Sequence, residues 1–261
     1  MASEARYRLL ADDYELTSVA WVPYRRIGLS VLALPLSAFV FCVVYSILFN
    51  FEHSTSTHCG AYNVLPSISA SIGSYSPQKE VWKLAIILHA IPRLLMVYFD
   101  FYYNREVLFE ITKIPSIIDT LLHIIENVAL VSLTLYDSSN YYSTHEKSFM
   151  IFILTSELHM LLIVAMHQRC RRVVRNKSEI NSFWWKKFMV CINVLAVIFS
   201  GYFYVLHNVR CPNYAYTMFA ICEYIVVFSN MIFHITSTLD FADRDLVFYR
   251  YGITMTHRPF D

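Results

Sequence analysis

Long stretches of apolar residues, separated by short polar segments, dominate the 261-residue chain. Six of these stretches have about 20 residues and few or no charged side chains, which is the length that a helix needs to cross a hydrocarbon core of ~30 Å. They cover residues 27–49, 84–103, 116–136, 148–167, 188–206 and 214–233. The pattern predicts an all-α, polytopic membrane protein, built as a bundle of six transmembrane helices within residues 27–240.

The composition agrees with a membrane protein and excludes several other classes. Hydrophobic residues make up 56% of the chain and charged residues only 16%, whereas a soluble domain carries roughly 25% charged residues. A disordered chain, a disulfide-rich secreted module and a nucleic-acid-binding protein are excluded on this basis. Because no segment between the apolar stretches is long enough for a separate soluble core, residues 1–261 are expected to form one membrane domain.

The positive charges lie mainly on one side of the predicted bundle. Of the 21 lysine and arginine residues, sixteen fall in the two tails and in the segments after the second and fourth stretches. Cytoplasmic segments of membrane proteins are rich in these residues, so residues 1–26 and 241–261 are expected to be cytosolic tails. The segments 51–82, 137–147 and 207–213 are then lumenal or extracellular loops.

The six cysteine residues divide in the same way. Cys59 and Cys211 are the two that fall in the predicted lumenal loops, and disulfides form in such oxidising compartments. We therefore predict a disulfide between Cys59 and Cys211. The alternative is a pair of free, buried thiols.

Ionisable residues within the predicted spans are candidates for function, because each costs ~2.5–3.5 kcal/mol at the centre of a bilayer. His89 and Arg93 are four residues apart and therefore share one helical face. They suit either the binding of an anionic headgroup or an ion pair with a carboxylate on another span. Glu126, near the middle of the third span, is the natural partner of Arg93, and that pair alone would compensate both charges.

Further polar residues mark the fourth and sixth spans. His145 and Glu146 lie at the predicted lumenal boundary, where a histidine beside a carboxylate can act as acid and base. A solvated first helical turn is the alternative interpretation. His159 lies within the fourth span. Glu223 and His234 lie on one face of the sixth span, which is typical of either a functional site or hydrogen bonds between helices.

Common catalytic and metal-binding motifs are absent from the sequence, including GxSxG, HExxH, the P-loop and the H-x4-D acyltransferase pattern. Histidine is frequent, with ten residues, but the sequence shows no grouping with the spacing of a metal site. We therefore expect no metal and no bound cofactor. A metal site assembled across several spans is the alternative.

Several short motifs, taken in their order along the chain, resemble one family. They include Thr57-His58-Cys59-Gly60, Leu65-Pro66-Ser67, Pro92-Arg93, Glu126-Asn127-Val128-Ala129-Leu130, His145-Glu146, His159-Met160, His207-Asn208 and Glu223-Tyr224. Together they extend over roughly residues 25–242 and resemble the post-GPI attachment to proteins factor 2 family.

The resemblance implies a multi-pass protein of the Golgi membrane, and also of the endoplasmic reticulum, that acts in fatty-acid remodelling of GPI anchors. In that pathway a lyso-GPI-anchored protein is reacylated at the sn-2 position with a saturated chain. GPI-anchored proteins and their lipid are thus the implied partners, and the implied activity is that of an acyltransferase using acyl-CoA or a phospholipid. The alternative is a non-catalytic membrane factor that presents or transports lipid for a separate acyltransferase, since a fold alone does not fix the chemistry.

For acyl transfer, a base must activate the sn-2 hydroxyl. The candidate catalytic residues are His145 or His58 as that base, with Glu146 orienting the base or compensating its charge.

The candidate substrate-binding residues are the ionisable residues of the spans. His89 and Arg93 would bind the phosphoinositol group, with Glu126 as their structural partner. His159 and Glu223 complete this set.

Overall fold

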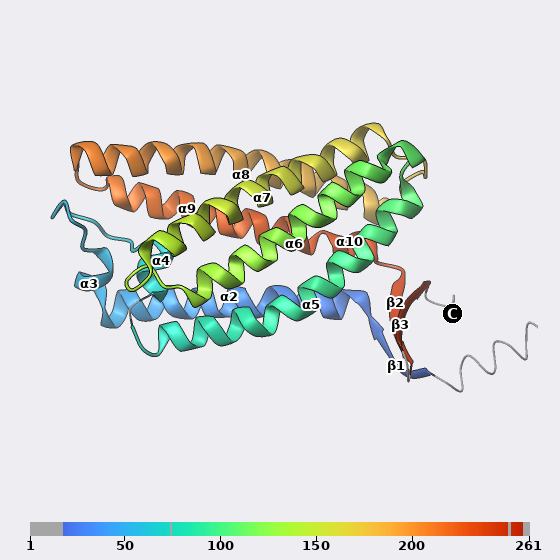
Figure 1. Ribbon diagram of the computed structural model, residues 1–261, viewed down its shortest axis with the longest axis horizontal. Coiled ribbons are helices and arrows are strands. Elements are labelled where there is room, and N and C mark those ends of the chain that lie inside the picture. Colours follow the sequence, from blue (N-terminus) through green and yellow to red (C-terminus); the bar gives the residue numbers. More distant parts are fainter. Residues whose placement is uncertain (1–17, 74, 250–251, 258–261) are drawn as a thin grey trace, which may run out of the picture.

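The computed structural model describes residues 18–73, 75–249 and 252–257. Six long helices run side by side and form an elongated bundle (Figure 1). They are α2 (Tyr24–Phe49), α5 (Gln78–Val107), α6 (Lys113–Leu135), α7 (Tyr142–Arg169), α8 (Lys177–Arg210) and α9 (Ala215–Ile235). Each of them is long and apolar enough to cross a membrane. The predicted fold class, an all-α polytopic bundle of six transmembrane helices, is confirmed.

Some helices extend well beyond the predicted apolar stretches. α8 has 34 residues and includes much of the basic segment that precedes its apolar part. A capping box fixes its first turn: the Asn176 side chain accepts a hydrogen bond from the Glu179 N–H, and the Glu179 carboxylate accepts one from the Asn176 N–H. Because these bonds satisfy donors that a helix start leaves free, the helix begins before the apolar residues do.

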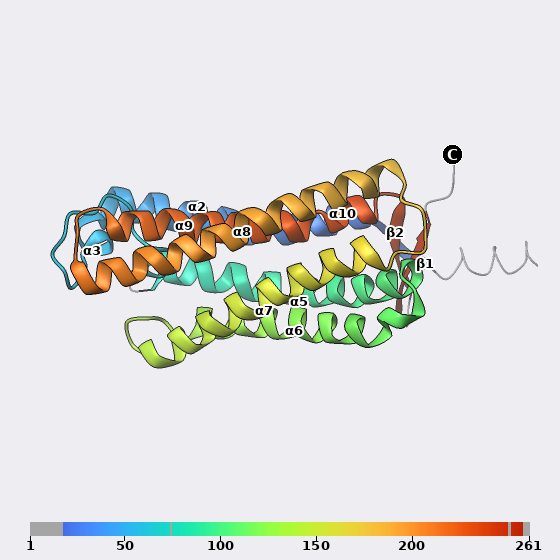
Figure 2. The ribbon, with the colours of Figure 1, turned by 90° about the horizontal axis from the view of Figure 1, so that it is seen from above.

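The long helices pack in hairpins. α6 and α7 form one hairpin and α8 and α9 another, while α2 lies along α5 (Figure 2). Large aliphatic side chains on the outside of the bundle stay exposed, including Ile91 at 74% and Val128 at 60%. A contiguous apolar surface of this kind suits lipid chains.

The apolar interior of the bundle divides into two clusters, and α5 contributes to both. Trp82 and Ile86 belong to one cluster, and Met96 and Phe99 belong to the other. The polar part of α5, residues 89–93, lies between them. Polar side chains therefore enter the middle of the bundle, with apolar packing on either side along its length.

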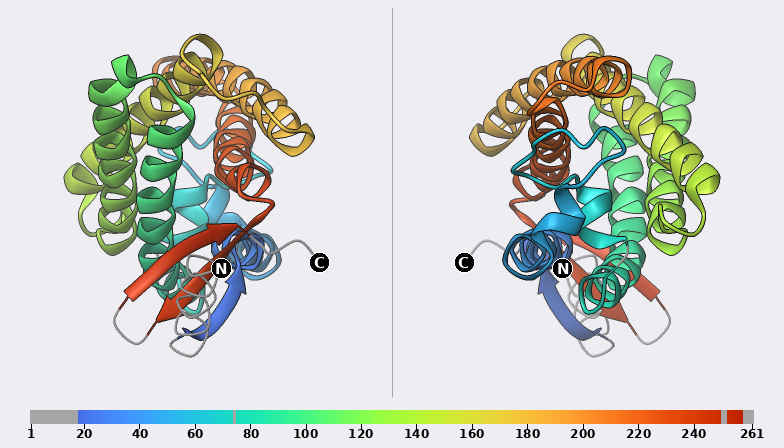
Figure 3. Two further views of the ribbon diagram at one scale, coloured as in Figure 1. Left: turned by 90° about the vertical axis from the view of Figure 1, so that its right-hand side faces the viewer. Right: turned by 90° about the vertical axis from the view of Figure 1, so that its left-hand side faces the viewer.

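One end of the bundle carries a three-stranded antiparallel sheet that the sequence analysis did not predict. Its strands, in spatial order, are β1 (Ser18–Pro23), β2 (Arg244–Tyr249) and β3 (Gly252–His257). Trp21 lies opposite Val247, which lies opposite Thr254. A short helix, α10 (Ser237–Asp240), leads from α9 into β2. The sheet joins the two segments assigned to tails, and we call this the sheet end (Figure 3).

The opposite end contains the long connection between α2 and α5, with α3 (Phe51–Thr55) and α4 (Ile68–Ile72). A disulfide joins Cys59 in this connection to Cys211, which directly follows α8, with the two Cα atoms 5.4 Å apart. The structure thus contains the predicted disulfide, and we call this the disulfide end. A single 3-10 turn (Glu110–Thr112) links α5 to α6 near the sheet end.

Candidate functional site

A cavity of about 140 Å³ lies inside the bundle. Residues of α2, α4 and all five later long helices line it, and its walls are mainly apolar, with side chains such as Trp82, Ile86, Leu130, Phe152 and Val227. Most of its polar side chains lie at two levels, and Asp100 lies further toward the sheet end. Ser69 and Glu223 lie toward the disulfide end, and a group around Arg93 lies near the middle of the bundle.

Helix α9 gives the length of one stretch of this cavity, whose lining on α5 extends further, from Trp82 to Asp100. Glu223 and His234 both line it and are eleven residues apart on α9. With a helical rise of 1.5 Å per residue, the two positions are separated by roughly 16 Å. A hydrocarbon core is ~30 Å thick, so the stretch of the cavity between Glu223 and His234 is about as long as one lipid leaflet is deep.

At the disulfide end, the structure places the predicted base His145 beside a serine. The Ser69 Oγ lies 2.9 Å from His145 Nε2, and His145 Nδ1 lies 2.8 Å from the Tyr136 carbonyl oxygen. A carbonyl oxygen only accepts, so Nδ1 carries the hydrogen and the neutral ring has its lone pair on Nε2. The Ser69 hydroxyl therefore donates to Nε2. Both side chains are half-buried, whereas Glu146 is exposed.

Helix α4, which carries Ser69, is held from two sides. The Ser67 side chain caps it by accepting a hydrogen bond from the Ala70 N–H at 3.1 Å. Glu223 Oε2 accepts the Ile68 N–H at 2.9 Å, so this buried carboxylate on α9 fixes the first turn of α4. The expected site residue Glu223 thus contacts Ile68, the residue directly before Ser69. No sequence motif would have revealed this link.

The loop between α6 and α7, which orients His145, is held by an ion pair. Lys79 Nζ lies 2.7 Å from Asp137 Oδ2, and the Asn140 N–H donates to Asp137 Oδ1 at 2.8 Å. Burial alone raises the pKa of Asp137, but the hydrogen bonds from Lys79 and Asn140 outweigh it and hold this pKa well below its ordinary value. Asp137 is therefore ionised at neutral pH and keeps the adjacent Tyr136 carbonyl in place.

The polar group in the middle of the bundle is centred on Arg93. Its guanidinium donates to Glu126 Oε1 at 2.6 Å, to His234 Nε2 at 2.8 Å and to His123 Nε2 at 3.5 Å. Asn230 also donates to Glu126 Oε1, at 3.0 Å. The ion pair expected between Arg93 and Glu126 is present and fully enclosed, since Glu126 is 0% exposed.

The same group contains residue types that can bind a metal. His123, Glu126, His159 and His234 each offer a ligand atom, and these atoms lie within 4.8 Å of one another. However, Arg93 already donates hydrogen bonds to three of the four. A cationic guanidinium thus takes the position that a divalent cation would need, and the donor set fits an arginine better than a metal.

The remaining predicted residues lie apart from the serine–histidine pair. His89 lines the cavity and contacts the Val31 carbonyl oxygen through Nδ1 at 2.8 Å. His159 pairs with Asp119 at 2.9 Å and lines a smaller hollow toward the sheet end. His58 is exposed at the disulfide end, with its ring centroid 5.4 Å from that of His207.

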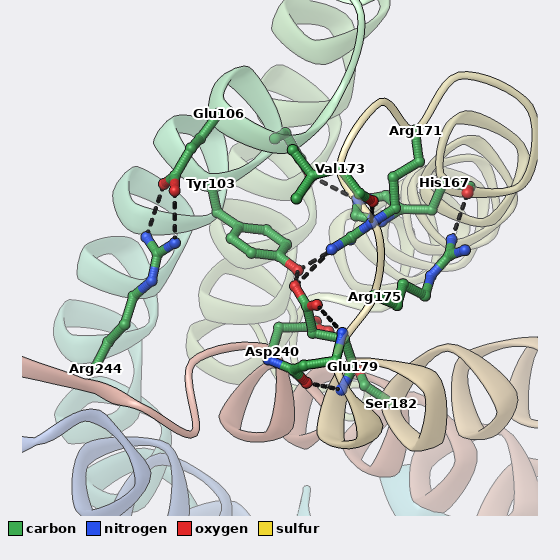
Figure 4. Close-up of polar contacts among 12 residues, drawn as sticks. Tyr103, Glu106, His167, Arg171, Val173, Arg175, Glu179, Ser182, Asp240 and Arg244 are labelled. Atoms are coloured by element: carbon green, nitrogen blue, oxygen red, sulfur yellow. Dashed lines mark hydrogen bonds and ion pairs between the residues drawn. The ribbon is translucent and has the colours of Figure 1, made fainter. Parts of the chain in front are cut away.

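A second charged network lies at the sheet end (Figure 4). Glu179 Oε1 accepts hydrogen bonds from Arg171 at 2.6 Å and from the Tyr103 hydroxyl at 2.5 Å. Arg244 pairs with Glu106 at 2.9 Å. Much of the basic segment before α8 is therefore used in contacts within the protein. These contacts fasten α5, α8 and β2 to one another.

These features define a multi-pass membrane protein with a mainly apolar cavity inside its helix bundle. The comparison with known families agrees with this class, since the Frag1/DRAM/Sfk1/Cwh43P N-terminal domain matches residues 23–244. The chain belongs to the post-GPI attachment to proteins factor 2 family within this domain class, which confirms the resemblance found in the sequence.

Relatives from several animals are similar over nearly their whole length. "Post-GPI attachment to proteins factor 2" of Drosophila pseudoobscura pseudoobscura is 41% identical over 236 residues, which cover 90% of this chain and 92% of that protein. "Acyltransferase PGAP2" of Xenopus tropicalis is 37% identical over 222 residues, covering 84% of this chain and 88% of that protein. The factor 2 protein of Caenorhabditis elegans is 34% identical, covering 87% and 88%. No solved structure matches the chain.

Proposed function

We propose that this protein remodels GPI anchors by transferring a saturated acyl chain to the sn-2 hydroxyl of a lyso-GPI-anchored protein. The names of its relatives support this: several are called post-GPI attachment to proteins factor 2, and two, from Xenopus tropicalis and Danio rerio, are called acyltransferases. The observation that carries the proposal is the Ser69–His145 pair at one end of an apolar cavity.

The cavity suits one acyl chain. Its apolar walls favour hydrocarbon by the hydrophobic effect, and its length of roughly 16 Å along α9 corresponds to the depth over which a chain extends within one leaflet. A chain with its ester near Ser69 would reach toward Arg93 with its methyl end.

The position of His145 supports its proposed role as the base. His145 lies in the first turn of α7, at the disulfide end of the bundle, and in our proposal this end lies where the ester linkages of a lipid adjoin the headgroup layer. Its Nε2 lone pair already accepts a proton-bearing hydroxyl. General-base assistance of this kind contributes typically 10²–10⁴-fold to a rate, with ~10³ as a middle value.

The predicted contact of His89 and Arg93 with phosphoinositol stays a prediction, and their depth argues against it. Arg93 lies near the middle of the 30-residue helix α5, about one leaflet from Ser69, and its guanidinium already serves Glu126 and His234. In our proposal this group bounds the part of the cavity that holds the chain. The phosphoinositol then lies outside the bundle, at the disulfide end.

The proposal includes the orientation and the compartment. The disulfide end faces the lumen, because the disulfide there requires an oxidising compartment and the lysine- and arginine-rich segments lie mainly at the sheet end. The family points to the Golgi membrane, and also to the endoplasmic reticulum membrane, as the place of action.

The second candidate function is lipid presentation without catalysis. It is favoured by one feature: Arg93, which lines the cavity, is paired with Glu126 within the protein, so the cavity can hold a chain without any reaction. GPI-anchored proteins are the partners in either case.

The test is acyl transfer by the purified protein in liposomes. A lyso-GPI-anchored protein is supplied with palmitoyl-CoA in one arm and dipalmitoyl phosphatidylcholine in the other, and sn-2 acylation is followed by mass spectrometry. We expect product with one donor, and a loss of about 10²–10⁴-fold in a folded His145→Ala variant. Lys147→Gln, at an exposed position on the same turn of α7, is the matched control. Absence of product with both donors, from a preparation that restores remodelling in deficient cells, would favour lipid presentation.

A further inference from the structure

Three serines lie in or next to α4, and only one of them faces a histidine among the described contacts. The Ser67 hydroxyl caps α4 and accepts a hydrogen bond from the Tyr216 hydroxyl at 2.7 Å. The Ser71 hydroxyl donates to the Ser67 carbonyl oxygen at 2.9 Å. Both therefore maintain the local fold. The Ser69 hydroxyl instead donates to His145 Nε2, and Ser69 lines the cavity.

The surroundings of His145 match what a serine nucleophile requires. An activated serine needs a base within hydrogen-bond reach, and that base needs a third group to orient it. Here the Tyr136 carbonyl oxygen accepts the Nδ1–H and fixes the ring, as a carboxylate does in serine hydrolases. The proton of the Ser69 hydroxyl points at the free Nε2 lone pair. Ser69 on α4 is 76 residues away from His145 on α7, whereas Tyr136, directly after α6, is nine residues away from His145.

The cavity extends inward from Ser69 itself. Its apolar walls begin beside Ser69 with residues such as Trp82 and Leu130, and they continue for about one leaflet along α9. An acyl chain attached to the Ser69 oxygen would therefore occupy the cavity over its length. The space suits one chain, so the chain of a donor and that of an acceptor would occupy it in turn.

We propose that Ser69 is a catalytic nucleophile that carries the acyl chain as an oxygen ester between donor and acceptor. This inference rests on the proposed acyltransferase function and adds a covalent intermediate to it. The donor is an acyl ester of a phospholipid or an acyl thioester, since both offer the same carbonyl to Ser69.

The first half-reaction loads the serine. Ser69 Oγ attacks the carbonyl carbon of the donor, and its proton moves to His145 Nε2. The bond from that carbon to the donor oxygen or sulfur then breaks. The departing lysophospholipid hydroxyl or thiol takes the proton from His145, and the acyl chain remains on Ser69.

The second half-reaction transfers the chain. The sn-2 hydroxyl of lyso-GPI attacks the acyl–serine carbonyl carbon, and its proton moves to His145 Nε2. The bond between that carbon and Ser69 Oγ breaks, and Ser69 recovers the proton. No electrons are exchanged with a further reagent, and the protein returns to its starting state.

The experiment traps the loaded serine. Purified full-length protein in liposomes receives ¹³C-labelled palmitoyl-CoA or ¹³C-labelled dipalmitoyl phosphatidylcholine without an acceptor, and its peptides are examined by mass spectrometry. We expect a labelled palmitoyl ester on Ser69 with one of the two donors, released when lyso-GPI is added. Ser69→Ala should abolish the adduct and lower sn-2 acylation by at least about 10³-fold. Ser143→Ala, an exposed serine on the first turn of α7, is the matched control.

A second variant guards against loss of folding. Ser69→Cys keeps the size of the side chain and should carry the palmitoyl group as a thioester, which neutral hydroxylamine releases while the serine ester resists it. A wild type that acylates lyso-GPI without any adduct on Ser69, or a Ser69→Ala variant with full activity, overturns the nucleophile and leaves the proposed function intact. A wild type that yields no product with either donor and the acceptor overturns the proposed function, and this inference with it.

Discussion

The two polar levels of the cavity differ in almost every physical respect. The Arg93 group joins the Arg93–Glu126 ion pair to His123 and His234 through hydrogen bonds deep inside the bundle. The Ser69–His145 pair contains no carboxylate or guanidinium, lies at helix ends and is half-buried, and Ser69 lines the cavity. Charges deep in a membrane must be compensated to exist there at all, and that compensation leaves them little freedom to react. The less conspicuous Ser69–His145 pair is the one in which a hydroxyl beside the cavity donates to an imidazole nitrogen.

The largest effect should come from breaking the Arg93 group. Arg93→Ala leaves Glu126 buried without its cation, and breaking a buried ion pair in this way costs about 3–5 kcal/mol. We expect loss of folded protein, measured as the monodisperse fraction in detergent after heating. The double variant Arg93→Met with Glu126→Leu removes both charges and should recover much of that fraction. If the recovered double variant also acylates lyso-GPI, the structural role of Arg93 is established; if Arg93→Ala alone is stable, the comparison above is wrong.

Removal of the disulfide should have the next largest effect. Cys59→Ser frees the α2–α5 connection from the end of α8, and loss of a disulfide costs typically about 2–4 kcal/mol. Thermal unfolding in detergent measures this loss. Acyl transfer should fall as well, because α4 lies in the same connection. Cys191→Ser, which removes an exposed free thiol, is the control and should leave both readouts unchanged.

A substitution with a smaller expected effect should distinguish most clearly between the two polar levels of the cavity. A Cβ added to Gly73 would lie 2.8 Å from the Ser69 carbonyl oxygen and 3.1 Å from Ser138 Oγ, so α4 must shift against the α6–α7 loop. Small displacements of reacting groups lower catalytic rates strongly. We therefore expect the Gly73→Ala variant to lose about tenfold or more in the rate of acyl transfer, which corresponds to ~1.4 kcal/mol of activation free energy. Its stability should be nearly unchanged.

The control for this substitution is Gly201→Ala on α8, where a Cβ meets no atom within 4 Å. Equal activity in both glycine variants would mean that the position of α4 does not govern the reaction.

The smallest effect concerns the ion pair of the α6–α7 loop. Because Lys79 is partly exposed, Asp137→Asn should cost at most about 1 kcal/mol. The pKa of Asp137 is lowered in the folded state, so the stabilisation is complete above the ordinary aspartate pKa of about 3.9 and is lost as the pH falls below it. The free energy of unfolding, measured from pH 3 to pH 8, should differ between variant and wild type by a constant amount above about pH 5. This difference should become smaller at acidic pH.

Much of the fold could be predicted from the sequence, because length and apolarity determine a membrane helix. The Arg93–Glu126 pair was predictable for a related reason, since two opposite charges at similar depth have few other partners. The disulfide followed from the sharing of one compartment by Cys59 and Cys211. In each case one strong physical constraint acts on a few residues.

Other features depend on contacts that no local pattern encodes. The strands have six residues each and lie in segments with no long apolar run, and their pairing joins opposite ends of the chain. Ser69 is one of several serines in its loop, and its partner His145 is 76 residues away. Glu146 was a candidate because it adjoins His145, yet neighbouring side chains on a helix diverge, and a backbone carbonyl fills the orienting position instead.

The sheet also determines whether the number of membrane crossings is even or odd. β1 precedes the first long helix and β2 follows the last, and the two strands are hydrogen-bonded along their length, with Trp21 opposite Val247. A bilayer cannot separate two strands that share hydrogen bonds, so the chain must return to the leaflet side from which it started. An odd number of crossings is thereby ruled out by backbone pairing alone, without any appeal to hydropathy or to the distribution of charge.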